Sequence, residues 1–107
     1  MIAYKVVFRD NKNRLTSVVM ETFKKGNAPS RRYAIGVYYF RNRWVTPHKN
    51  RPPLMVFRTL QDAKRYVATM WWGEIWKCKI KKSTQTVDFG ITPGTVFADK
   101  VKLLEKV

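Results

Sequence analysis

The residues of this 107-residue chain that could do chemistry are basic and aromatic rather than nucleophilic or acidic. Between Glu21 and Asp62 lie 40 positions without an acidic residue, and nine of them are lysine or arginine. Aromatic rings are interleaved with these charges, above all between Tyr38 and Trp44. Arginine holds phosphate in a bidentate fork, and a flat ring offers a base a stacking surface. This basic tract therefore indicates a platform for RNA or single-stranded DNA.

Two groups of residues make up the predicted nucleic-acid site. One is the basic tract, and the other is a stripe of lysines at alternating positions after Glu74. Together they comprise Arg31, Arg32, Arg41, Arg43, Trp44, Lys49, Arg51, Lys77, Lys79 and Lys81. Two alternatives stay open: the rings could be core residues, and the lysine stripe could be the solvated face of a strand. The stripe joins the site only if the fold brings it beside the tract.

Groups that could catalyse a reaction or hold a metal are few. His48 is the one histidine and Cys78 the one cysteine, so a zinc site or a Cys/His pair has too few donors. The seven carboxylates are scattered along the chain, and no glycine-rich phosphate loop is present. We therefore expect a protein without enzymatic activity, metal or cofactor. His48 is expected in a surface loop, and Cys78 as a small buried residue.

The net charge is +15, from 22 lysines and arginines against 7 acidic residues. Self-repulsion at this charge lowers stability, so we expect a positive surface that meets an acidic partner, either nucleic acid or a nucleoprotein complex. A single thiol cannot form an internal disulfide, and no stretch approaches the ~20 apolar residues of a membrane span. The opening MIAYKVVFRD lacks the order of a signal peptide. We expect a cytoplasmic protein with no membrane partner.

The elements that must position these residues are mostly strands. Period-two alternation and β-favouring composition predict strands over 2–9, 14–22, 31–45, 54–58 and 74–81, followed by two short strands around 96–98 and 101–107. Gly26 and Pro29 predict a loop over 24–30. The third strand is expected to bend at Gly36 or to break near Asn42.

Alternation also predicts which side chains share a face. In the strand 74–81, one face carries Trp76, Cys78 and Ile80, and the other carries Ile75, Lys77, Lys79 and Lys81. In the third strand, the face expected to meet the core carries Tyr33, Ile35, Val37 and Tyr39. The opposite face, a candidate functional surface, carries Arg32, Tyr38, Phe40, Asn42 and Trp44.

One principal helix is predicted, over about 59–72. Thr59 is its N-cap, Asp62 stands in the capping-box position three residues later, and Gly73 is the expected stop. Its apolar face carries Leu60, Ala63, Tyr66, Val67 and Met70. The predicted fold class is α+β: a single domain over 1–107, with a mixed or mostly antiparallel sheet and the helix packed on one face.

The order of segments resembles that of small phage-type accessory proteins. The resemblance rests on the opening Tyr4-Lys5-Val6-Val7, the segment from Phe57 to Ala63, the strand Ile75-Trp76-Lys77-Cys78 and the ending from Gly94 to Leu104. The layout is also similar to stripped-down ADP-ribosyltransferase-like domains. The catalytic glutamate pattern of that superfamily is not matched, so neither activity nor site residues are carried over. The resemblance implies a viral accessory protein directed against a host defence complex.

Three functions follow from these observations. The leading hypothesis is a non-enzymatic nucleic-acid-binding accessory protein, with RNA or single-stranded DNA favoured over duplex because the basic tract is predicted as strand rather than recognition helix. The second is a protein-directed inhibitor that covers an acidic or nucleic-acid-binding surface of a host complex. The third is a small transferase or nucleotide-binding protein of ADP-ribosyltransferase-like fold.

Overall fold

The structure is a computed structural model that describes residues 1–25, 28–49, 53–69, 73–85 and 94–107, and of these only the backbone over 18–25 and 28–36. Its elements, in chain order, are β1 (Ile2–Arg9), β2 (Leu15–Lys25), β3 (Ala28–Tyr39), β4 (Trp44–Val45), β5 (Leu54–Phe57), α1 (Leu60–Val67), β6 (Gly73–Lys82) and β7 (Thr95–Lys106). Among the described residues, no helix has the length and apolar character needed to cross a membrane.

Four strands close into a small barrel in the order β1, β5, β7, β6 and back to β1. All four of these pairings are antiparallel. β1 and β6 pair along their length, from Ile2 opposite Lys79 to Phe8 opposite Gly73. The seam between β1 and β5 is short, with Tyr4 opposite Phe57. Closure gives each barrel strand a neighbour on both sides, which reduces the open strand edges through which sheets aggregate.

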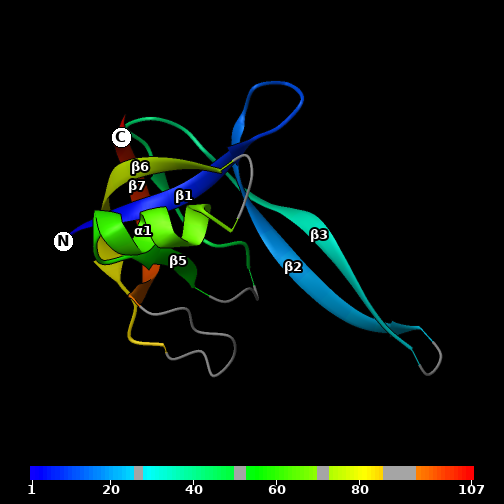
Figure 1. The fold of residues 1–107 in the computed structure, drawn as a ribbon. Coiled ribbons are helices and arrows are strands. Elements are labelled where there is room, and N and C mark those ends of the chain that lie inside the picture. Colours follow the sequence, from blue (N-terminus) through cyan, green and yellow to red (C-terminus); the bar gives the residue numbers. More distant parts are fainter. Residues whose placement is uncertain (26–27, 50–52, 70–72, 86–93) are drawn as a thin grey trace.

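The strands β2 and β3 form a long hairpin that leaves the barrel as an arm (Figure 1). At its base, β2 pairs with the end of β1 through Thr16 opposite Phe8. A β-bulge between Thr16 and Val18 follows, and it changes the register of the two arm strands. Bulges increase local twist, which is a physical reason for the arm to diverge from the barrel at this point.

The barrel interior is filled by alternate residues of its four strands. A four-stranded barrel is narrow, so several inward positions carry small side chains: Ala3, Cys78 and Ala98 are fully buried. The larger residues of the same core cluster are Val7, Leu54, Val56, Trp76, Ile80, Val96, Val101 and Leu103, joined by Leu15, Val37 and Tyr39 from the base of the arm. The predicted burial of Trp76, Cys78, Ile80, Val37 and Tyr39 is confirmed.

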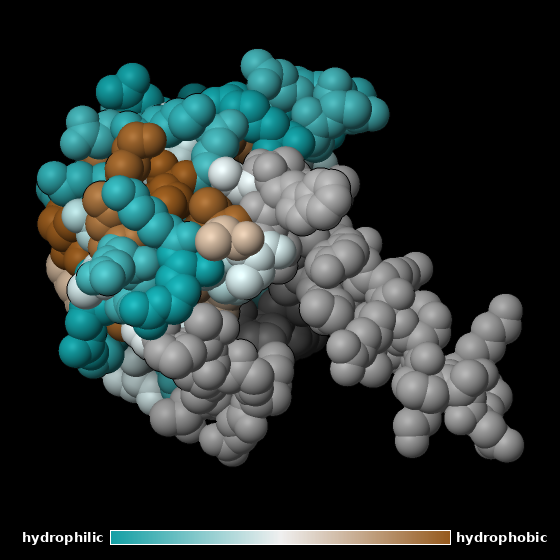
Figure 2. Space-filling view, viewed as in Figure 1, coloured by the Kyte–Doolittle hydropathy of each residue, from teal (hydrophilic) through white to brown (hydrophobic). Residues whose placement is uncertain are grey.

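The helix α1 lies outside the barrel and covers a second, smaller apolar cluster. Ala63 packs there with Val6, Phe8 and Phe57, and the partly buried Tyr66 and Val67 complete the contact. β1 is therefore buried on both faces, one inside the barrel and one under α1. Figure 2 shows apolar residues gathered beside the helix, over β6 and β1.

The predicted N-cap of α1 is confirmed. The Asp62 backbone N–H donates to Thr59 Oγ1 at 3.1 Å, and the Thr59 hydroxyl donates to Asp62 Oδ2 at 2.8 Å. Gly94, with φ of 83°, packs directly against Asp62, and its carbonyl accepts a hydrogen bond from the Arg58 N–H. These contacts fasten the start of the helix to the start of β7.

The predicted α+β fold class is wrong. The chain is mostly β with a small closed four-stranded barrel, and the helix expected over 59–72 is only the eight residues Leu60–Val67. The residues 70–72 lie outside the described part of the chain. Gly73 opens strand β6 rather than stopping the helix. Helical spacing correctly predicts a helix in this segment, but the overall architecture comes from pairing between strands that are distant in sequence.

The structure confirms some of the predicted strand boundaries and corrects others. The first strand (2–9) is confirmed, and the break near Asn42 is confirmed by its φ of 62°. The loop expected over 24–30 is wrong, because β2 continues to Lys25 and β3 begins at Ala28. The two short final strands are one strand, β7, because a register shift opposite Lys81 and Lys82 lets it continue past Asp99.

Candidate nucleic-acid interface

Four lysines face one another on the outside of β6 and β7. Lys79 lies opposite Lys102, and Lys81 lies opposite Lys100. Residues directly opposite in an antiparallel pair project to the same side of the sheet. Their strand neighbours Cys78, Ile80, Val101 and Leu103 are buried in the barrel, so the four lysines lie on its outer surface. We call Lys79, Lys81, Lys100 and Lys102 the lysine block.

No carboxylate of the described residues is in ion-pair contact with the lysine block. Like charges directly opposite each other destabilise a strand pair. By contrast, Glu74 pairs with Arg9 at 2.5 Å and with Lys106 at 3.6 Å. The block therefore lowers the stability of the fold unless something negative binds it.

A short turn beside β7 brings one part of the basic tract, from Arg41 to Trp44, to the lysine block. Asn42 adopts a left-handed conformation with φ of 62°, which asparagine tolerates better than most residues. Its N–H donates to the Leu103 carbonyl at 2.8 Å, and Arg41 Nε donates to the Leu104 carbonyl at 3.0 Å. The chain then pairs with β7 through Trp44 opposite Lys102. Thus β7 lies between the Arg41–Trp44 part of the basic tract and the lysine stripe.

Two aromatic rings are exposed at this turn. Trp44 is 43% exposed, with the Nζ atoms of Lys100 and Lys102 at 4.7 and 4.9 Å from its ring centroid. Phe40 is 51% exposed, and the Arg43 guanidinium lies 5.6 Å from its ring centroid. These distances are within the range of cation–π attraction. Each ring thus combines a stacking surface with positive charge.

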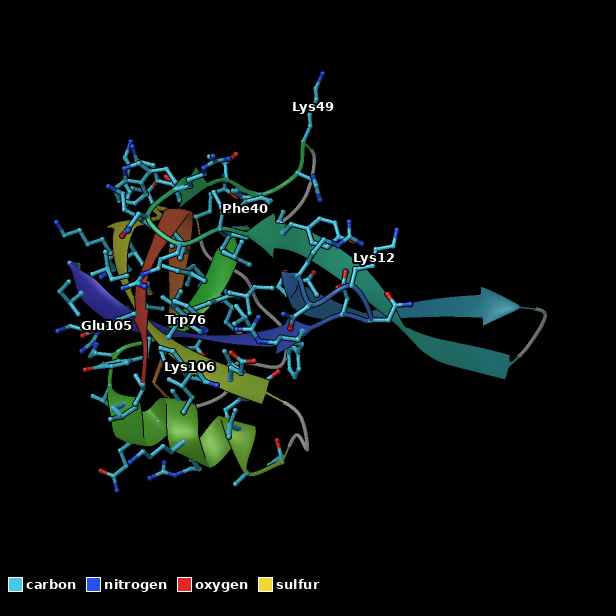
Figure 3. The ribbon with its side chains drawn as sticks, turned by 90° about the horizontal axis from the view of Figure 1, so that it is seen from above. Lys12, Phe40, Lys49, Trp76, Glu105 and Lys106 are labelled. Atoms are coloured by element: carbon cyan, nitrogen blue, oxygen red, sulfur yellow. The ribbon has the colours of Figure 1, made fainter. Side chains whose placement is uncertain are left out.

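The structure brings together five of the ten predicted site residues: Arg41, Arg43, Trp44, Lys79 and Lys81. Lys77 is on the same face of β6, but it lies opposite Glu105 and so has a carboxylate across the strand pair. Figure 3 shows Phe40 and Lys49 on the side of the barrel opposite α1, with Lys49 extending further outward.

The remaining three predicted residues lie elsewhere. Arg31 and Arg32 are on β3 in the arm, opposite Thr22 and Glu21, and the structure describes only their backbone. Arg51 lies outside the described residues. Of the predicted core face of the third strand, Tyr33 and Ile35 are likewise described by backbone alone.

Sequence reasoning missed Lys100 and Lys102, which connect the two predicted groups. The signal was present, because Lys100, Lys102 and Leu104 alternate with the buried Val101 and Leu103. The prediction of two short strands, with a break near Asp99, obscures this alternation. Acidic residues flank the block along β7, with Asp99 before it and Glu105 after it.

Cys78 and His48, the single thiol and the single imidazole of the chain, differ in their exposure. Cys78 is fully buried, and burial raises the pKa of its thiol to about 12, so it is a neutral thiol. His48 is exposed in the loop after β4, as predicted. Within the part of the chain that is described, no group of three or more His, Cys, Asp or Glu residues could hold a metal ion.

Lys5 is a buried charged residue inside the barrel. Its Nζ donates to the Met55 carbonyl at 2.7 Å and lies 5.5 Å from the centroid of the Tyr39 ring. Burial lowers the pKa of this lysine from 10.5 to about 8. Its hydrogen bond joins β1 to β5 at the short seam of the barrel.

Comparison with known proteins gives no match to a protein-family model, a curated protein or a solved structure.

Proposed function

We propose that this chain binds nucleic acid, RNA or single-stranded DNA, without catalysing a reaction, on the outer face formed by β4, β6 and β7. The observation that carries the proposal is the lysine block beside the exposed Trp44 ring. Within the described part of the chain these four like charges have no carboxylate partner, so they oppose folding, and phosphates placed among them would remove that repulsion. A polyanion also gains from the release of its counterions.

The secondary structure of this surface favours a single strand over a duplex. Proteins that read duplex DNA commonly place a helix in the major groove. Here α1 packs its apolar side on the barrel, on the side away from Phe40 (Figure 3). A strand surface that carries rings and cations is typical of proteins that bind unpaired bases.

The resemblance to phage-type accessory proteins adds a proposed biological role. In that role the chain is a viral accessory protein, and it acts on a host defence complex through the nucleic-acid component of that complex. A second candidate function is a protein-directed inhibitor that covers an acidic surface. The exposure of Phe40 and Trp44 favours it, because aromatic residues are enriched at the centres of protein interfaces.

The salt dependence of binding separates the two candidates. Affinity for oligouridylate and oligothymidylate, measured by fluorescence anisotropy between about 50 and 300 mM NaCl, should fall with a log–log slope of about −3 if roughly four phosphates are neutralised. A flat response, or no binding at low salt, would reject nucleic acid as the ligand and favour an acidic protein.

Matched variants locate the interface. Lys79→Gln with Lys81→Gln should weaken binding about tenfold or more and reduce the size of the salt slope by about 1.4, because two phosphate contacts are lost. The control, Lys12→Gln with Lys64→Gln, removes the same charge from the β1–β2 turn and from α1. It should change affinity by less than about threefold. Equal losses in both variants would show that binding is general and not confined to this face.

A further inference from the structure

We propose that the interface binds one unpaired strand, with a base stacked on Trp44 and the sugar–phosphate backbone running along the lysine block. This inference rests on the proposed function and specifies its ligand. It follows from the spacing of the lysines, from the position of the two rings and from the hydrogen bonds that hold the turn between them.

The spacing of the lysine block matches one phosphate backbone. Lys79 and Lys81 are two residues apart, as are Lys100 and Lys102, so the members of each row are about 7 Å apart along their strand. That distance is close to the separation of successive phosphates in an extended strand. The two rows lie only about 5 Å apart, which is less than the ~12 Å width of a major groove. Both rows can therefore contact the same backbone, with one row on either side of it.

Trp44 stands where a base attached to that backbone would lie. It is opposite Lys102 across the β4–β7 pair, so its ring borders the block directly. The ammonium groups of Lys100 and Lys102 approach the ring within 4.9 Å, yet 43% of the residue remains exposed to solvent. The exposed part of the indole can take a base, while the lysines neutralise the adjoining phosphates.

Phe40 provides a second ring on the other side of the turn. The turn is held by the Asn42 N–H bond to Leu103 and by the Arg43 N–H bond to Phe40. These bonds fix the backbone that carries both rings before a ligand arrives, which limits the ordering required on binding. Paired bases are stacked inside a duplex and cannot reach two such rings. The arrangement thus selects a single strand with a footprint of about four nucleotides.

A double-mutant cycle between protein and ligand tests this placement. The ligands are an oligothymidylate of about six nucleotides and an abasic strand of the same length and charge. Each is titrated against the wild type, Trp44→Ala and Trp44→Phe. We expect the wild type to prefer the thymidylate by about 5- to 150-fold, Trp44→Ala to lose this preference and Trp44→Phe to keep most of it.

Each alternative result has a distinct meaning. If the wild type binds both strands equally, or if Trp44→Ala weakens both equally, base stacking is rejected while nucleic-acid binding stands. If a duplex of equal length binds as tightly as the single strand, the selection for unpaired bases is rejected. If neither strand binds at low salt, the proposed function itself fails. Circular dichroism of both variants should match the wild type, because Trp44 lies outside the buried core.

Discussion

Lys5 is a charged residue buried in an apolar core. It is 5% exposed, inside an otherwise apolar barrel, and its ammonium group donates to the Met55 carbonyl. Burial lowers its pKa to about 8, whereas the pKa of the unfolded chain stays near 10.5. The unfolded chain therefore binds more protons than the folded chain between these two values. Stability must rise with pH across that window and is reduced below about pH 8.

The first prediction concerns this pH dependence. Between about pH 8 and 9, the free energy of unfolding of the wild type should rise by about 1 kcal/mol relative to that of Lys5→Met. Cys78 and Tyr39, whose pKa values burial raises, oppose the trend at higher pH, but both proteins contain them. Urea denaturation at the two pH values measures the difference. Parallel pH profiles would show that Lys5 is not buried as a charged group.

At the scale of secondary-structure elements, the pairing of β6 with β7 assembles the lysine block of the candidate site. Each strand alone presents alternating lysines, which is an ordinary solvated pattern. Their antiparallel register places Lys79 opposite Lys102 and Lys81 opposite Lys100, and so turns two ordinary stripes into one block. β4 then adds Trp44 at the side of β7 away from β6. The site therefore forms only where β4, β6 and β7 lie side by side.

The second prediction follows from this register. Lys79→Glu with Lys81→Glu should raise the free energy of unfolding by about 1 kcal/mol at low salt, because two like-charge pairs become opposite-charge pairs. The same variant should lose oligonucleotide binding. Urea denaturation at low and high salt measures the effect, which should shrink as the charges are screened.

A charge-matched variant controls for the lower net charge. Lys12→Glu with Lys64→Glu changes the net charge by the same amount away from the block, and we expect a smaller gain in stability. If the block variant is instead destabilised, the two strands do not pair in the register described.

At the scale of the whole molecule, the barrel and the arm have different roles. The buried core uses the base of the arm, through Leu15, Val37 and Tyr39, while β2 and β3 continue outward as two strands. A two-stranded hairpin has little stability of its own in water. The barrel should therefore fold without the outer part of the arm.

The third prediction removes that outer part. Val19 lies opposite Ala34, so residues 20–33 can be replaced by Asn-Gly, which favours a two-residue hairpin turn. We expect cooperative thermal unfolding with a Tm within a few degrees of the wild type. Binding of the short thymidylate should change less than about threefold near 150 mM salt, because arm charges are screened beyond about 8 Å. Loss of cooperative unfolding would show that the arm belongs to the barrel core.

Local sequence patterns determined a substantial part of this structure. Alternation correctly predicts that Cys78 points inward and that Lys79 and Lys81 point outward. The capping box at Thr59 and the strand break at Asn42 also lie at the predicted positions. Each of these features depends on neighbours a few residues away. That range is the range over which backbone geometry and side-chain periodicity act.

The tertiary structure alone decided the barrel, the burial of Lys5 and the lysine block. Period two tells which residues share a side of a strand, but it does not tell which side is the interior or which strand lies next to it. β1 has both faces buried, so its alternation could not reveal that Lys5 points into the barrel. Lys79 meets Lys102 because closing four strands around a narrow core sets one register between β6 and β7. Such closure depends on contacts between residues far apart in the chain, which no local pattern encodes.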